Sequence, residues 1–276
     1  MTTTTISVPT VSGAPLASGV GDRLRWAISD TLVITKRNLI ATTRSPEALF
    51  FSTVQPIMFV LLFRYVFGGA INPGHGISYV NYLMPGIFVQ TVAFGAVQTS
   101  IGLAEDLQKG LIERFRALPM ARSAVLVGRT VADLVRNVLI IGLMTLVGYL
   151  IGFRFQAGLP NALACVAVVS AFGLALSWLF AFVALTVRGA EAAQSAGFVV
   201  IFPLVFASSV FVPVTSMPDW LQAFAKVSPV TLTANAARTY ALDGGVPGSL
   251  AGAAAWIIAL LAIFIPLCVW RYRRMS

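Results

Sequence analysis

The sequence carries little charge for its length. Of its 276 residues only 11% are Asp, Glu, Lys or Arg, 58% are hydrophobic, and the mean hydropathy is +0.86. Soluble domains have about a quarter of charged residues, so this balance excludes an ordinary soluble protein. The length and composition predict a single integral membrane domain.

Cysteine and histidine are almost missing. The two cysteines, Cys165 and Cys268, lie singly in apolar runs with no CxxC spacing. They are expected to be small hydrophobic core residues, without a disulfide or metal framework. The one histidine, His75, has no cysteine near it, so no zinc site is expected.

Several motifs that carry chemistry are also missing. The sequence has no GxxxxGK[ST] loop, so the chain is not expected to bind ATP in the usual way. It has no HExxH motif and no acidic pair within an apolar run, which argues against a membrane-embedded enzyme, and no catalytic residues are expected. The net charge of +9 suggests nucleic acid as a partner, but the basic residues flank apolar runs, so none is expected.

Six apolar runs reach the ~20 residues that a helix needs to cross the hydrocarbon core. They cover residues 48–67, 79–103, 125–152, 160–187, 195–214 and 250–270. With loops assigned alternately, 13 Lys and Arg residues fall on the side of the N-terminus and only Arg154, Lys226 and Arg238 on the other. This asymmetry predicts an all-α membrane domain over residues 45–276 in the cytoplasmic membrane, with both termini in the cytoplasm.

The first 44 residues are expected to lie outside the spans. Residues 1–21 are rich in Thr, Ser, Pro and Gly and predict a disordered tail. Residues 22–44 place Leu24, Ile28, Leu32, Thr35 and Leu39 at helical spacing, which predicts an amphipathic helix on the cytoplasmic membrane surface. Ser45-Pro46-Glu47 then supplies an N-cap, a first-turn proline and an acidic residue, which predict the start of a new helix.

A polar stretch from Glu105 to Arg122 separates the second and third runs. Leu111, Phe115 and Leu118 share one helical face, and Pro119 ends the short helix. Two interpretations remain open. The stretch is either a solvated loop that fixes the topology or a docking helix for a soluble partner.

The third run, at ~1.5 Å per residue, is ~42 Å long against a hydrocarbon core of ~30 Å, so its cytoplasmic end is expected to project. Asp133 and Arg136 lie in that half and are predicted to pair at the membrane interface, although an intramembrane charge can also be functional. In the first two runs Gln55, Gln90 and Gln98 either bond between helices or line a substrate route. The sequence leaves both choices open.

The segment between the last two runs, 215–249, is long but not polar. Pro218 is predicted to begin a short helix whose aromatic face, with Trp220 and Phe224, lies at the outer membrane surface. Pro229 is predicted to begin a second short helix before the turn at 243–245.

Two stretches resemble a known family. Gly110-Leu111-Ile112-Glu113-Arg114-Phe115-Arg116-Ala117-Leu118-Pro119-Met120-Ala121-Arg122 resembles the cytoplasmic-loop signature of ABC-2 type exporter permeases, of the daunorubicin/doxorubicin-resistance type. Many members have Thr after the first Gly, whereas this chain has Leu111, as in the drug-resistance branch. The stretch from Met217 to Pro229, followed by Arg238, resembles the short re-entrant helices that this family forms on the outer side. The resemblance covers about residues 25–274, through hydrophobic layout as much as through motifs.

The resemblance implies half of an ABC exporter, in which two permease copies, expected to be a homodimer, assemble with two ATPase subunits that bind ATP and Mg. It implies an amphiphilic drug or lipid as the cargo, moved outward. The implied ATPase-coupling residues are Gly110, Leu111, Glu113, Arg114, Phe115, Arg116, Leu118 and Pro119. The implied external re-entrant residues are Pro218, Trp220, Phe224, Pro229 and Arg238.

The alternative is a secondary transporter or channel without an ATPase partner. Such a protein is expected to carry buried acidic or histidine relays in mid-span, and these runs are nearly free of acids. A neighbouring reading frame that encodes an ATPase with a phosphate loop would favour the exporter.

Overall fold

The computed structural model describes residues 20–44, 46–71, 76–110 and 124–274, and within these ranges every regular element is helical. The elements are α1 (Val20–Thr43), α2 (Pro46–Leu61), η1 (Leu62–Phe67), α3 (Tyr79–Gln108), α5 (Ala124–Leu150), α6 (Gly158–Thr186), α7 (Ala190–Phe206), η2 (Val214–Ser216), α8 (Asp219–Val227), α9 (Pro229–Arg238), η3 (Thr239–Asp243) and α10 (Leu250–Arg274). The prediction of an all-α protein is confirmed for this part of the chain.

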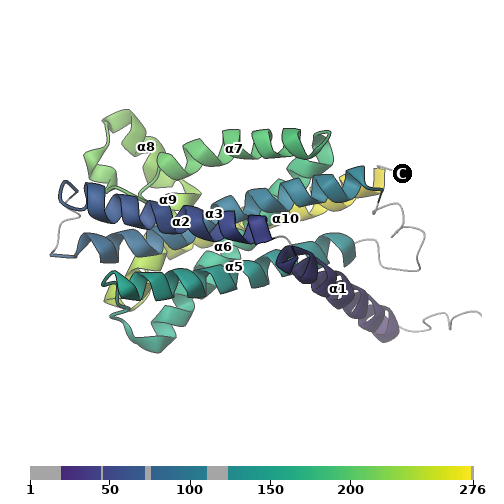
Figure 1. Ribbon diagram of the computed structural model, residues 1–276, viewed down its shortest axis with the longest axis horizontal. Helices are drawn as coiled ribbons and strands as arrows, with labels where there is room; N and C mark the ends of the chain where they lie inside the picture. The colour runs from purple at the N-terminus through teal and green to yellow at the C-terminus, as the bar shows by residue number, and fades with distance from the viewer. Residues whose placement is uncertain (1–19, 45, 72–75, 111–123, 275–276) are drawn as a thin grey trace, which may run out of the picture.

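Helix α3 forms the centre of a bundle whose long helices run lengthwise (Figure 1). It packs against α2, α5, α6, α7 and α9. Most of its side chains are apolar, and Leu83, Met84, Ile87 and Phe88 are fully buried. A helix with apolar side chains around most of its circumference packs in the interior of a bundle.

Within the part of the chain that the structure describes, four helices are long and apolar enough to cross a membrane: Tyr79–Gln108, Leu126–Leu150, Gly158–Thr186 and Leu250–Tyr272. Two shorter apolar helices cover Thr53–Phe67 and Ala190–Phe206. Each of the six predicted runs overlaps one of these helices. Four candidate spans are therefore found in the described residues, and a count of six remains a prediction.

The fifth predicted run ended at residue 214, whereas α7 ends at Phe206. The chain then bends, and its carbonyl groups bond to side chains from distant helices. Tyr79 Oη donates to the Phe211 oxygen at 2.9 Å, and Arg238 Nη2 donates to the Val210 oxygen at 3.1 Å. The apolar run continues to residue 214, so the sequence pattern does not reveal that α7 ends at Phe206. The bend that follows the helix is bonded to residues far away in the sequence.

Helix α1 leaves the bundle at an angle, at the end of the molecule where α10 also ends (Figure 1). It packs on α5 through Ile34 and Thr35, which are buried. Ile28 and Leu32 of the predicted apolar stripe are instead exposed. The predicted contact of α1 with the membrane surface stays a prediction. Residues 1–19 of the predicted tail lie outside the described residues.

At the opposite end, α8 and α9 begin directly after Pro218 and at Pro229, where the sequence placed the two short helices. Trp220 and Phe224 of α8 are exposed, with 75% and 46% of their surface accessible. Helix α9 instead packs among α3, α6 and α10. The re-entrant position of these helices in a membrane stays a prediction.

Both cysteines are unpaired and buried. Cys165 contributes to the main hydrophobic core, and Cys268 Sγ lies 3.4 Å from the carbonyl oxygen of Trp178. Among the residues with described positions, no group of three or more His, Cys, Asp or Glu side chains could hold a metal ion. His75 falls outside those residues.

Candidate functional site

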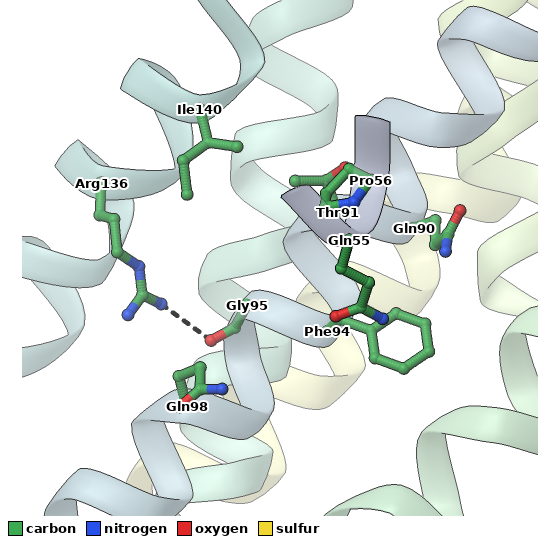
Figure 2. A pocket seen from close by; sticks show the side chains of 9 residues that line it. All are labelled: Gln55, Pro56, Gln90, Thr91, Phe94, Gly95, Gln98, Arg136 and Ile140. Atoms are coloured by element: carbon green, nitrogen blue, oxygen red, sulfur yellow. Dashed lines mark hydrogen bonds between the residues drawn. The ribbon is translucent and has the colours of Figure 1, made fainter. Parts of the chain in front are cut away.

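Helices α2, α3 and α5 meet around a narrow groove, partly open to the surroundings, with a cavity volume of about 60 Å³. Figure 2 shows the side chains that line it. We call it the glutamine groove, and its lining residues are Gln55, Pro56, Gln90, Thr91, Phe94, Gly95, Gln98, Arg136 and Ile140. The structure therefore brings together all three glutamines that the sequence singled out, whereas Phe94, Gly95 and Ile140 were not predicted to belong to a site with them.

The spacing of the residues explains how two helices supply most of the wall. Gln90, Phe94 and Gln98 follow one another at four-residue intervals along α3, so they share one face. Arg136 and Ile140 are likewise four residues apart on α5. The wall is polar at the amides and the guanidinium, and apolar at Phe94 and Ile140.

Arg136 is the charged member of the groove lining. Its Nη2 donates to the carbonyl oxygen of Gly95 at 2.8 Å, which Figure 2 marks, and lies 3.2 Å from Asp133 Oδ1. The other oxygen of Asp133, Oδ2, accepts a hydrogen bond from Thr99 Oγ1 at 2.6 Å. The two residues that the sequence predicted as an ion pair thus lie in contact, and both are largely shielded from solvent. Their predicted place at the membrane interface is not tested.

Close packing brings α5 against α3 at this point. A Cβ added to Gly95 would lie 2.9 Å from Asn137 Oδ1, and one added to Gly173 of α6 would lie 3.0 Å from Asn137 Nδ2. Small residues allow such approach between helices in membranes. Asn137 is fully buried, and neither of its side-chain polar atoms has a hydrogen-bond partner among the described residues.

Gln90 also presents an unpaired group. It is 2% exposed, and its Oε1 has no hydrogen-bond partner within the described parts of the chain. A buried polar atom without a partner costs ~1–3 kcal/mol, so a ligand that donates a hydrogen bond here would relieve that cost. Gln90 therefore places an unsatisfied acceptor within the groove wall, beside apolar side chains.

A row of phenylalanine rings continues from the groove along α7 to η1. Sequence reasoning missed this row, although its members on α7 recur every four residues. Neighbouring ring centroids lie 4.2–5.6 Å apart in the order Phe94, Phe202, Phe206, Phe211, Phe63 and Phe67. Phe202, Phe206 and Phe67 are at least 40% exposed.

Arg238 is buried near the start of α3. In the described parts of the chain, each hydrogen-bond acceptor found for its guanidinium is a neutral group. Its Nε donates to the Tyr82 carbonyl oxygen at 2.8 Å, and Nη1 donates to Ser209 Oγ at 3.0 Å and to Asn235 Oδ1 at 2.8 Å. Its Nη2 donates to the carbonyl oxygens of Ser209 and Val210. These five bonds use the full donor capacity of a guanidinium and tie α9 to α3 and to the bend after α7. The sequence placed Arg238 in the external segment without these contacts.

Of the predicted ATPase-coupling residues, Gly110 alone lies within the described residues. It follows α3 with a φ of 64°, and its N–H donates to the Leu107 oxygen at 3.1 Å. A positive φ favours glycine, so Gly110 is suited to end this helix. Leu111, Glu113, Arg114, Phe115, Arg116, Leu118 and Pro119 lie outside the described residues.

A bundle of long apolar helices with a polar groove between them is typical of multi-span membrane proteins. The sequence profile of the ABC-2 type transporter family matches residues 29–242, and the chain belongs to this family. The resemblance inferred from the motif around Gly110 is thereby confirmed.

The relatives of the chain are permeases. It is 33% identical over 260 residues to the daunorubicin resistance ABC transporter permease protein DrrB1 of Streptomyces coeruleorubidus, covering 94% of this chain and 91% of that one. It is 28% identical over 265 residues to the probable doxorubicin resistance ABC transporter permease protein DrrC of Mycobacterium tuberculosis, with 94% and 93% covered. It is also 27% identical over 214 residues to the putative transport permease ycf38 of Cyanophora paradoxa, with 75% and 72% covered.

Proposed function

We propose that this chain is the permease subunit of an ABC exporter that moves an amphiphilic drug or lipid outward across the cytoplasmic membrane. The family match over residues 29–242 carries the proposal. Because the sequence has no phosphate loop, ATP and Mg are bound by a separate ATPase, present in two copies with two copies of this permease. The chain spans the membrane six times, and both termini lie in the cytoplasm.

The glutamine groove is the proposed entry of the cargo route. Gln55, Gln90 and Gln98 provide hydrogen-bonding groups, and Phe94 and Ile140 provide apolar contact. Such a mixed wall suits a molecule with both polar and apolar parts. Arg136 is paired with Asp133, so the groove does not require a charged cargo.

The phenylalanine row supports an apolar or aromatic part in that cargo. Aromatic rings 4.5–7 Å apart interact favourably through edge and stacked contacts, so a planar molecule can exchange one ring contact for the next. Two relatives are named for resistance to daunorubicin or doxorubicin. We infer a cargo of that general kind.

Affinity purification of the tagged permease from its native cell in mild detergent tests the assembly. The proposal expects an ATPase chain with a phosphate loop to co-purify in a one-to-one ratio. Recovery of a fully active transporter without any nucleotide-binding chain would reject it and favour the secondary transporter.

A further inference from the structure

Asp106, near the end of α3, bonds to arginines from two other helices. Its Oδ1 lies 2.9 Å from Arg37 Nη2 of α1, and its Oδ2 lies 2.9 Å from Arg129 Nη1 of α5. The side chains of Asp106 and Arg129 are 14% and 17% exposed. Ion pairs shielded in this way are screened less than surface pairs, so this three-residue arrangement, the Asp106 clamp, holds three helix ends together.

Gly102 makes room for the clamp. It lies one turn before Asp106 on α3, and a Cβ added there would be only 1.9 Å from Arg129 Nη2. The guanidinium of Arg129 therefore lies across the backbone of Gly102 on its way to Asp106. A side chain at position 102 would displace it without altering any charge.

The contact between α1 and α5 is equally close beside the clamp. A Cβ added to Gly128 would be 2.8 Å from Ile34 Cβ, and Thr35 Oγ1 donates to the Gly128 carbonyl oxygen at 3.1 Å. Gly128 directly precedes Arg129. The clamp is thus supported by packing between α1 and α5 as well as by charge.

The clamp also has a defined place along the chain. Helix α3 ends at Gln108 and α5 begins at Ala124, so Asp106 and Arg129 lie on the helices just before and just after the segment with the predicted ATPase-coupling residues. The same two helices supply Gln90, Gln98 and Arg136 to the glutamine groove.

We propose that Asp106 is a positioning residue for coupled transport, which makes the ends of α3 and α5, together with α1, move as one body. This inference rests on the proposed function. Force that an ATPase applies to the connecting segment would then reach both groove-lining helices together. Without the clamp, the two helices could shift independently, and ATP would be hydrolysed without transport.

The test compares Asp106→Asn, Arg129→Gln and Gly102→Ala in cells and in the purified complex. Each variant is expected to keep its membrane abundance and its ATPase partner, while cargo efflux per ATP hydrolysed falls about tenfold, within the range of coupling between protein sites. Asp106→Glu, which keeps the charge, is expected to retain most of the efflux.

Two matched controls isolate the clamp. Glu105→Gln removes the neighbouring acid, whose pair with Lys109 is exposed, and Gly142→Ala adds a Cβ on α5 that meets nothing within 4 Å. Neither should change efflux per ATP. In the double variant of Asp106→Asn with Arg129→Gln, efflux per ATP should fall no further than in either single variant. The two single variants and the double variant all disrupt the same Asp106 clamp, so their effects should not add.

Three results would overturn the inference. These are unchanged efflux per ATP in Gly102→Ala, a parallel fall of hydrolysis and efflux, or loss of membrane abundance in both Asp106→Asn and Gly102→Ala, which would make the clamp purely structural. Failure of the wild-type permease to recover an ATPase would instead reject the proposed function.

Discussion

Arg238 lies with its guanidinium carbon 3.8 Å from the centre of the Tyr82 ring, and its Nε donates to the carbonyl oxygen of the same tyrosine. One residue of α9 is therefore fixed to the start of α3 by both a cation–π contact and a hydrogen bond. The other donors of Arg238 hold the bend after α7. This one side chain joins the three elements that form that end of the bundle.

Arg238→Gln should lower the free energy of unfolding by about 3 kcal/mol or more, since each buried acceptor left unpaired costs ~1–3 kcal/mol. The stability of Arg238→Lys should lie between those of the wild type and Arg238→Gln. The ammonium of Lys offers three donors, but it lacks the planar fork of a guanidinium. Thermal unfolding of the purified protein in detergent measures both effects.

Arg154→Lys is the matched control, since Arg154 is exposed and bonds to nearby carbonyl groups of Tyr149 and Phe153. It should unfold at the wild-type temperature. Equal stability of Arg238→Gln and wild type would show that the bonds of Arg238 do not hold this end together.

Gln90→Leu should weaken cargo binding without harming the fold. It removes an acceptor that has no partner among the described residues, so stability should be kept or slightly raised. Loss of one hydrogen bond to the cargo should raise the KM for efflux by about 2- to 10-fold. Gln194→Leu, at an exposed position of α7, is the control. An unchanged KM in Gln90→Leu would remove the groove from the cargo route.

Local patterns predicted much of the fold, because helix starts and apolar runs depend on residues that are adjacent in the sequence. Pro46 and Pro229 begin helices as first-turn prolines, and Gln55, Gln90 and Gln98 were singled out as polar residues within apolar runs. The end of α7 was predicted too late, since it depends on an arginine 29 residues after Ser209.

Contacts between distant helices account for what the sequence did not reveal. Asp106 was part of a predicted polar stretch, but its two arginine partners are 69 and 23 residues away. The spacing of charges within one helix gives no sign of such a pair. Phe94 and Ile140 likewise join the groove only because α3 and α5 pack together.

Phe115→Asp should release the ATPase while the permease still inserts at normal abundance. We predict that Leu111, Phe115 and Leu118 form the face that docks on the ATPase, and burying an unpaired charge there is strongly unfavourable. Glu113→Gln should have a milder effect, because exposed ion pairs contribute only ~0–1 kcal/mol. Co-purification and efflux are measured together, and wild-type levels of both in Phe115→Asp would exclude this segment as the coupling element.

Single cysteines should report the topology. Gly74→Cys and Gly245→Cys should react with an impermeant maleimide on intact cells, whereas Lys109→Cys should react only after the cells are opened, as the charge asymmetry predicts. The native Cys165 and Cys268 are buried and should give little background. Labelling of Lys109→Cys from outside would invert the orientation.

Transport into sealed proteoliposomes tests the proposed function most directly. Vesicles containing the permease and its co-purified ATPase, with the nucleotide-binding side facing outward, are given a fluorescent amphiphile together with Mg and either ATP or a non-hydrolysable analogue. We predict accumulation of the amphiphile inside the vesicles with ATP, none with the analogue, and none when the permease is reconstituted alone. Accumulation by the permease alone, driven by an ion gradient and indifferent to ATP, would contradict the account.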